Sequence, residues 1–202
     1  MQHIMSHEKE ILNILKTNQI LGSGDLKARG IPTMYLSRMM REGKLHKVGR
    51  GLYSLPDENY GENQSLLEAS RIVPKGIVCL LSALSFHELT TQNPFNVWLA
   101  IDRNMAVPKH NTPMIRIMRY SKSVYSSGIE THNINGMTLL VYNPSKTVAD
   151  CFKYRNRIGL DVALEALREG WRYKKITMDE IWRYAKICRV SNVIRPYLES
   201  LI

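Results

Sequence analysis

The residues best placed to do chemistry lie in one basic stretch, Lys27–Arg50, and the chemistry they suit is polyanion binding. The stretch holds seven Lys or Arg against one acid, Glu42, a local net charge of +6. Arginine donates paired hydrogen bonds to guanine, and Ser or Thr contacts phosphates or base edges. The side chains expected to contact DNA are Thr33, Tyr35, Ser37, Arg38, Arg41, Lys44, Lys47 and Arg50.

A helix from Ile31 to about Glu42 is expected to position most of these side chains. Pro32 suits the first turn of a helix, and Gly43 suits its end. Three apolar side chains lie three to four residues apart, so they should share a face and pack on an earlier helix: Leu36, Met39 and Met40. The polar and basic side chains then lie on the other face, and a helix of about three turns fits a major groove.

The flanking segments predict the rest of a small domain. The apolar positions 11, 12, 14 and 15 form the stripe of a first helix, and Asp25–Arg29 forms a short second helix that Gly30 ends. The Gly49-Arg50-Gly51 turn joins two β-prone runs, residues 44–48 and 52–55, into a hairpin. The order helix, short helix, helix, hairpin is that of a winged helix-turn-helix, which we assign to residues 1–57.

Composition narrows the class of protein. The net charge is +10, and 44% of the 202 residues are hydrophobic, which is sufficient for a folded core. The longest nearly apolar run, Ile77–Phe86, is about half of what a membrane span needs. The three cysteines, at positions 79, 151 and 188, lack zinc-site spacing and are too few for a disulfide scaffold. We therefore expect a reduced, cytoplasmic protein without a metal or cofactor.

The polar, turn-rich segment Pro56–Asn63 reads as a linker to a second domain, residues 64–202. Strands are expected at 96–101, 114–119 and 137–142, and helices at 66–72, 80–89, 144–154, 160–169, 178–187 and 192–201. The fold class is therefore α+β: a winged helix-turn-helix followed by a mixed α/β domain with a small sheet and several helices.

Basic residues are also abundant in the second domain. Residues 103–175 hold 13 Lys or Arg against five acids. A possible second basic surface consists of Lys146, Lys153, Arg155 and Arg157, although cations at a helix end also simply offset the helix dipole. His87-Glu88 begins like a zinc-protease helix, but position 91 is Thr91 where a second His is required. No active site is predicted.

Three motifs in the chain belong together. The first is Ile31–Leu45, continued by Gly49–Tyr53. The second is Leu81–Thr90, and the third is Pro144–Phe152, which continues through Arg155–Leu167. These motifs resemble the AbiEi antitoxins of bacterial type IV toxin–antitoxin systems. Together they span most of the chain, and the first is shared with many winged-helix regulators.

This resemblance implies a set of functions. Such proteins act in abortive infection (phage defence) as transcriptional repressors that bind inverted repeats in their own promoter. They also neutralise a cognate nucleotidyltransferase-like toxin, mainly through the second domain and without need of a stable complex. Two other hypotheses remain open: a winged-helix regulator of another regulon with a ligand- or protein-sensing second domain, and a nucleic-acid enzyme. The enzyme would need a metal-binding carboxylate cluster, which the sequence does not assemble.

Overall fold

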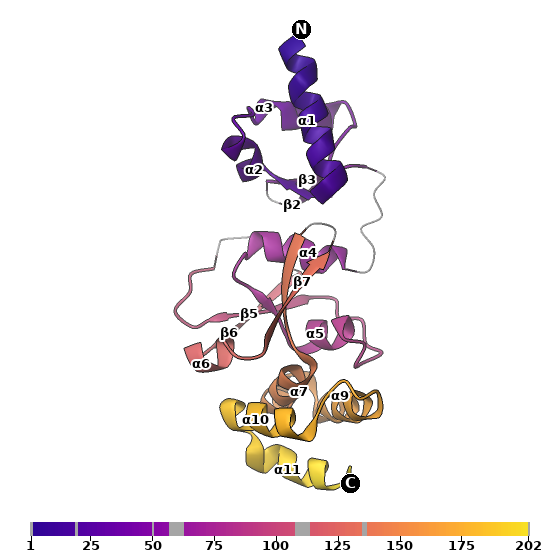
Figure 1. The fold of residues 1–202 in the computed structure, drawn as a ribbon, viewed down its shortest axis with the longest axis vertical. Coiled ribbons are helices and arrows are strands. Elements are labelled where there is room, and N and C mark those ends of the chain that lie inside the picture. Colours follow the sequence, from indigo (N-terminus) through magenta and orange to yellow (C-terminus); the bar gives the residue numbers. More distant parts are fainter. Residues whose placement is uncertain are drawn as a thin grey trace. The chain divides into compact units, whose positions relative to one another are not determined.

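The computed structural model describes residues 2–18, 20–49, 51–56, 63–107, 114–134 and 137–201. The chain divides into two compact units (Figure 1). The N-terminal unit is built mainly on Met1–Pro74, and the C-terminal unit mainly on Lys75–Val107, Pro113–His132 and Leu139–Ile202. Each unit has its own apolar core.

In its described residues, the N-terminal unit combines four helices with three short strands. In chain order they are α1 (Gln2–Asn18), β1 (Ile20–Gly22), α2 (Ser23–Ala28), α3 (Met34–Arg41), β2 (His46–Gly49), β3 (Leu52–Ser54) and α4 (Gln64–Ile72). The expected order of helix, short helix, helix and hairpin is present, and this unit fits a winged helix.

The core of the N-terminal unit forms where α1 meets α3. Ile11, Ile14 and Leu15 of α1 are buried at helical spacing, as the apolar stripe predicts. Leu36 and Met39 of α3 are buried in the same cluster. The buried face of α3 therefore fixes which of its side chains face outward.

The start of α3 differs from the prediction, because Ile31 ends the preceding helix instead. The Ile31 amide donates to the Leu26 carbonyl at 2.9 Å, and Gly30 has a left-handed φ of +71°, which closes α2. Helix α3 begins only at Met34. At its other end, Gly43 has φ +69°, as the expected helix stop requires.

A third strand joins the predicted hairpin. β2 and β3 pair antiparallel, and β1 pairs antiparallel with β3, which gives the order β1-β3-β2. No strand is predicted from the sequence at the β1 segment. It has three residues, and its strand conformation depends on pairing with residues 52–54, which lie 30 to 34 positions away.

Helix α4 groups with the N-terminal unit. Arg71 forms an ion pair with Asp25, and the same Asp25 oxygen accepts a hydrogen bond of 2.9 Å from the Gly22 amide at the start of α2. The sequence-based boundary, between residues 57 and 64, precedes α4, whereas the compact units divide after Pro74.

The C-terminal unit is a five-stranded sheet with helices. Its elements are β4 (Ile77–Val78), α5 (Leu80–Phe86), β5 (Val97–Asp102), β6 (Ile115–Tyr120), α6 (Lys122–Tyr125), β7 (Ile129–Ile134), β8 (Met137–Tyr142), α7 (Pro144–Lys153), α8 (Arg155–Ile158), α9 (Leu160–Arg172), α10 (Met178–Cys188) and α11 (Ser191–Glu199). The sheet order is β6-β5-β4-β8-β7, with β4 antiparallel to β5 and parallel to β8. The molecule is thus a mixed α+β protein.

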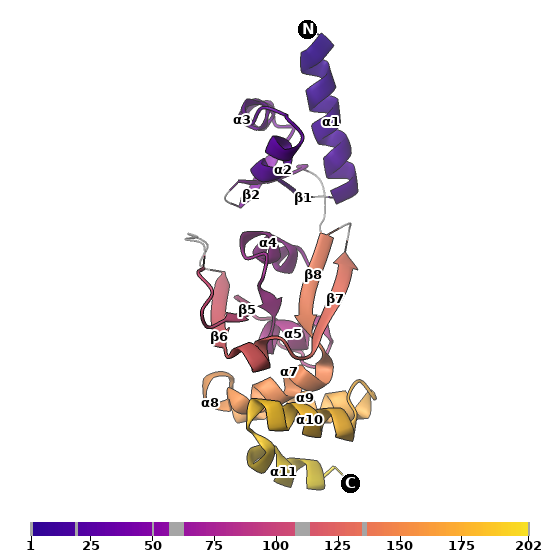
Figure 2. The same ribbon diagram turned by 60° about the vertical axis from the view of Figure 1, so that its left-hand side comes forward.

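Helix α7 is the centre of the C-terminal unit, and α5, α9 and α10 pack around it (Figure 2). Its residues from Ser145 to Phe152 are all buried. The helix begins at Pro144, after Asn143, whose side chain accepts a hydrogen bond of 2.8 Å from the Lys146 amide. Because α7 is central, two of its charged side chains, Lys146 and Asp150, are buried.

Candidate nucleic-acid interface

The outward face of α3 carries most of the side chains predicted to contact DNA. Ser37, Arg38 and Arg41 are exposed on α3, and Thr33 is exposed just before it. Tyr35 is only half-exposed, because its ring lies edge-on against the His7 ring with 5.3 Å between centroids. The helix thus presents a narrow polar face.

Two of the predicted cations are held in an ion-pair network that joins α1 to α3. Arg38 Nε donates to Glu42 Oε1 at 2.9 Å, and Arg38 Nη2 lies 3.4 Å from Glu8 Oε1. Lys44 Nζ bridges the same two carboxylates, at 2.7 Å from Glu42 and 3.2 Å from Glu8. Two cations face two anions, so the network is neutral and adds little to the local positive field.

The hydrogen bonds of this network also perturb its pKa values. Hydrogen bonds from Lys44 and Arg38 lower the pKa of the Glu42 carboxyl. The hydrogen bond to Glu42 raises the pKa of Arg38 and the pKa of Lys44. All three groups therefore stay charged around neutral pH, and the network remains intact there.

Arg41 and Lys47 are in a different situation. Both are exposed, and neither has an acidic partner among the residues that the structure describes. Arg41 lies at the end of α3 and Lys47 on β2. Both side chains are therefore available to an anionic partner. Arg50, predicted for the turn of the hairpin, lies outside the described residues.

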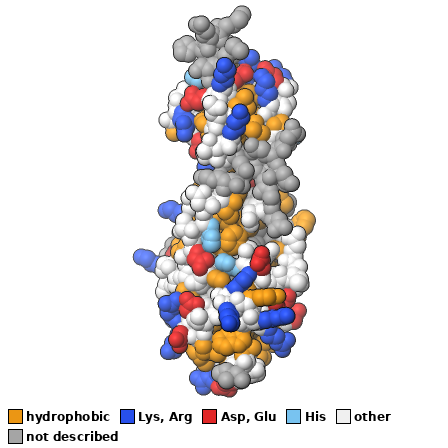
Figure 3. All heavy atoms as spheres, turned by 45° about the vertical axis from the view of Figure 1, so that its right-hand side comes forward, with side chains coloured by type: hydrophobic (Ala, Val, Ile, Leu, Met, Phe, Trp, Pro, Cys, Tyr) orange, Lys and Arg blue, Asp and Glu red, His pale blue; other side chains and the backbone are white. Residues whose placement is uncertain are grey.

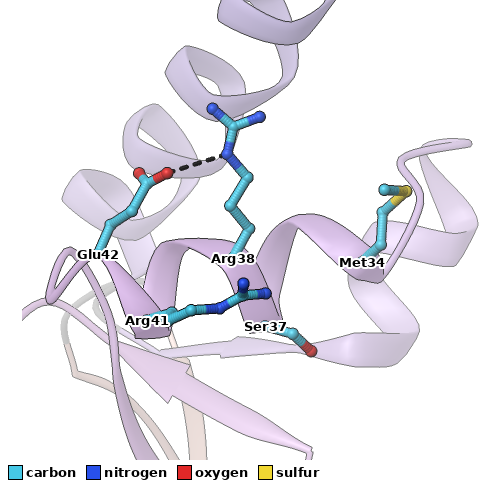
Figure 4. Close-up of a pocket in the computed structure, with 5 residues that line it drawn as sticks. All are labelled: Met34, Ser37, Arg38, Arg41 and Glu42. Atoms are coloured by element: carbon cyan, nitrogen blue, oxygen red, sulfur yellow. Dashed lines mark hydrogen bonds and ion pairs between the residues drawn. The ribbon is translucent and has the colours of Figure 1, made fainter.

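The face of α3 forms an open depression, lined by Met34, Ser37, Arg38, Arg41 and Glu42 (Figure 4). Arg38 reaches toward Glu42, whereas Arg41 runs along the helix (Figure 4). Met34, at the other end of the face, is 71% exposed. Met34 is not among the side chains predicted from the sequence, although its helical spacing from Ser37 and Arg41 places it on the same face.

Comparison with known families agrees with this geometry. Residues 9–56 match the family model described as "Transcriptional regulator, AbiEi antitoxin". A search of the curated proteins found no match to the chain. The family match confirms the resemblance drawn from the basic stretch. The matched residues 9–56, called the AbiEi segment below, contain α2, α3, both strands of the hairpin and most of α1.

We predict that Glu8→Gln increases the DNA affinity of the AbiEi segment. The substitution removes one anion from the network, so Arg38 and Lys44 together gain one net charge for phosphates. Each added phosphate contact steepens the slope of log affinity against log salt concentration by about 0.9. The measurement is a salt titration of DNA binding by fluorescence anisotropy.

The matched control is Glu10→Gln, which makes the same charge change two residues along α1. Glu10 has no ion pair among the described residues, so its removal frees no cation. An equal change in slope for both variants would show that only overall charge matters.

Most of the side chains predicted to form a second basic surface are not fully exposed in the structure. Lys146 is fully buried and pairs with Asp150 one turn along α7, so its assignment to a surface is wrong. Arg155 is half-buried and donates to the Phe152 carbonyl at 3.0 Å, which caps the end of α7. Lys153 is half-buried, and Arg157 is exposed. Figure 3 shows acidic side chains mixed with basic ones over the helices of this unit.

The surroundings of Lys146 explain its burial. Its ammonium lies 4.1 Å from the ring centroid of Tyr142 and 5.1 Å from that of Tyr120. The Cys188 thiol donates to the other oxygen of Asp150 at 3.2 Å. Gly128 permits the close approach, because its φ is +73° and a Cβ there would lie 2.7 Å from Lys146 Cβ.

The three cysteines around this pair are free and buried. Burial raises the pKa of the Cys79 and Cys151 thiols, and it raises the pKa of Cys188 to about 12. All three are therefore neutral thiols near pH 7. Among the described residues, no group of His, Cys, Asp and Glu is arranged to hold a metal ion, and no helix is long and apolar enough to cross a membrane.

Proposed function

We propose that this protein is a cytoplasmic, non-enzymatic antitoxin of a type IV toxin–antitoxin system that represses its own promoter. Its N-terminal unit acts as a winged helix-turn-helix: α3 enters the major groove, α2 crosses behind it, and the β2–β3 hairpin is the wing. Two copies occupy the two halves of an inverted repeat. The C-terminal unit neutralises a nucleotidyltransferase-like toxin, without need of a stable complex.

One observation carries the DNA-binding part of this proposal. Within an AbiEi segment, α3 buries its apolar face and leaves Ser37 and Arg41 exposed together, with Arg41 outside the ion-pair network. Lys47 lies exposed on the hairpin, where a wing contacts the phosphate backbone. Thr33 and Lys44 flank the helix and are proposed as phosphate contacts.

The antitoxin part rests on the family of the N-terminal segment and on the motifs of the C-terminal unit. Lys153 and Arg157 are proposed as secondary nucleic-acid contacts, since both retain some solvent exposure. Lys146 is not proposed as a contact, because it is fully buried.

The test is binding of the full chain to the DNA upstream of its own gene. We expect specific binding that weakens steeply with salt, and Lys47→Ala should reduce the salt slope by about 1 while weakening binding to all sequences alike. Binding that does not distinguish the upstream DNA from an unrelated duplex would contradict the repressor assignment.

The two activities should separate in one variant. When expressed from an independent promoter beside the neighbouring toxin gene, full-length Arg41→Ala should still rescue growth although it fails to repress a promoter fusion. Loss of rescue would place antitoxicity in the DNA-binding face.

A further inference from the structure

Met34 is an unusual residue for the outward face of α3. It is 71% exposed, although single exposed apolar side chains are common on protein surfaces and need no special explanation. Its position distinguishes it. Met34 lines the same depression as Ser37 and Arg41, which are exposed on the helix proposed above to enter the major groove.

These three side chains follow one line along the helix. They are spaced i, i+3 and i+7, so they lie on the same side of α3. With a rise of 1.5 Å per residue, Met34 and Arg41 are about 10 Å apart along the axis, which corresponds to about three base-pair steps. A helix laid along a major groove would therefore present them to different base pairs.

The chemical groups that base pairs expose in the major groove indicate which of them Met34 can contact. The apolar group that a base pair offers in the major groove is the C5-methyl of thymine, and the other edges there are hydrogen-bond donors and acceptors. A thioether side chain makes no strong hydrogen bond but gains from covering a methyl group. In helix-turn-helix proteins the N-terminal residues of the recognition helix contact base edges, and Met34 is the first residue of α3.

We propose that Met34 determines sequence specificity by packing on a thymine methyl in each half-site, about three base pairs from the base that Arg41 contacts. This inference rests on the proposed function, since it assumes that α3 lies in the major groove. The Met34 contact gives α3 a preference for thymine that its charged side chains do not provide.

The test replaces each thymine of the upstream duplex in turn with uracil, which removes the methyl and leaves the pairing edge unchanged. At one thymine per half-site, we expect the affinity of the wild-type chain to fall about fourfold, the equivalent of ~0.8 kcal/mol for one buried carbon. Met34→Ala should bind more weakly and lose its sensitivity at that thymine only. Met34→Leu should keep the sensitivity, because it keeps an apolar contact.

Phe95→Ala is the matched control, since Phe95 is 83% exposed but belongs to the C-terminal unit. It should show the wild-type uracil profile. If the wild-type chain binds the upstream duplex but no uracil changes its affinity, or if Met34→Ala keeps the wild-type profile, the inference is overturned and the repressor function stands. If the wild-type chain does not prefer the upstream duplex, both fall together.

Discussion

Replacing Lys146 with Met should destabilise the C-terminal unit by about 3–5 kcal/mol, because the substitution leaves Asp150 buried without a counter-ion. Both side chains are 0% exposed, so water cannot reach the carboxylate to compensate. The thiol of Cys188 remains as a hydrogen-bond donor, but a neutral thiol is a weak partner for a charge. Asp150→Leu should also destabilise the C-terminal unit, because it leaves the Lys146 ammonium buried without a counter-ion.

The double variant Lys146→Met, Asp150→Leu should recover most of the lost stability. Removing both charges abolishes the desolvation cost of the pair, and buried ion pairs replaced by apolar side chains are often neutral in stability. Recovery would separate the loss of charge balance from a simple loss of packing. The recovered protein also tests whether the pair has any role besides stability, since its antitoxicity can be compared with wild type.

Urea denaturation followed by tryptophan fluorescence suits this measurement. The three tryptophans, at positions 98, 171 and 182, all belong to the C-terminal unit, so the signal reports on that unit alone. Lys186→Met is the control: Lys186 lies exposed on α10, and its change should stay within about 0.5 kcal/mol. A Lys146→Met variant as stable as the control would contradict the burial of an ion pair at this site.

The elements of the N-terminal unit were largely predictable because their signals are local. Helix α3 follows from the spacing of Leu36 and Met39, and the hairpin follows from its glycine-flanked turn. Strand β1 was missed because it exists through pairing with β3, and three residues carry no pattern of their own. The same reason applies to β4, which has two residues.

The electrostatic part of the site was less predictable. Charge counting along the chain treats Arg38 and Arg41 as equivalent, but Glu8 lies 30 positions before Arg38 and reaches it only after α1 packs on α3. Lys146 was assigned to a surface for a similar reason. Its spacing of four from Asp150, with Val148, Ala149 and Cys151 between and beside them, was the signal of a buried pair on an apolar helix.

The consequence for function is an expected difference between two arginines three residues apart. Arg41→Lys should weaken binding to the upstream DNA by roughly 1–3 kcal/mol, about 5- to 150-fold, and leave binding to unrelated DNA almost unchanged. Lysine keeps the charge that phosphates attract, but it cannot form the paired hydrogen bonds that a guanidinium makes with guanine. The loss should therefore appear in specificity and not in the salt slope.

Arg38→Lys provides the matched comparison. The guanidinium of Arg38 is engaged by Glu8 and Glu42, and an ammonium can pair with the same carboxylates, so specific affinity should change by less than about threefold, or ~0.7 kcal/mol. Competition titrations of both variants against the upstream and an unrelated duplex measure the two effects. Equal losses of specificity would mean that DNA draws Arg38 out of the network, and that the neutral cluster between α1 and α3 opens when the helix enters the groove. A selective loss at Arg41 would mean that α1 keeps Arg38 in the ion-pair network and that, of the two arginines, only Arg41 distinguishes the bases.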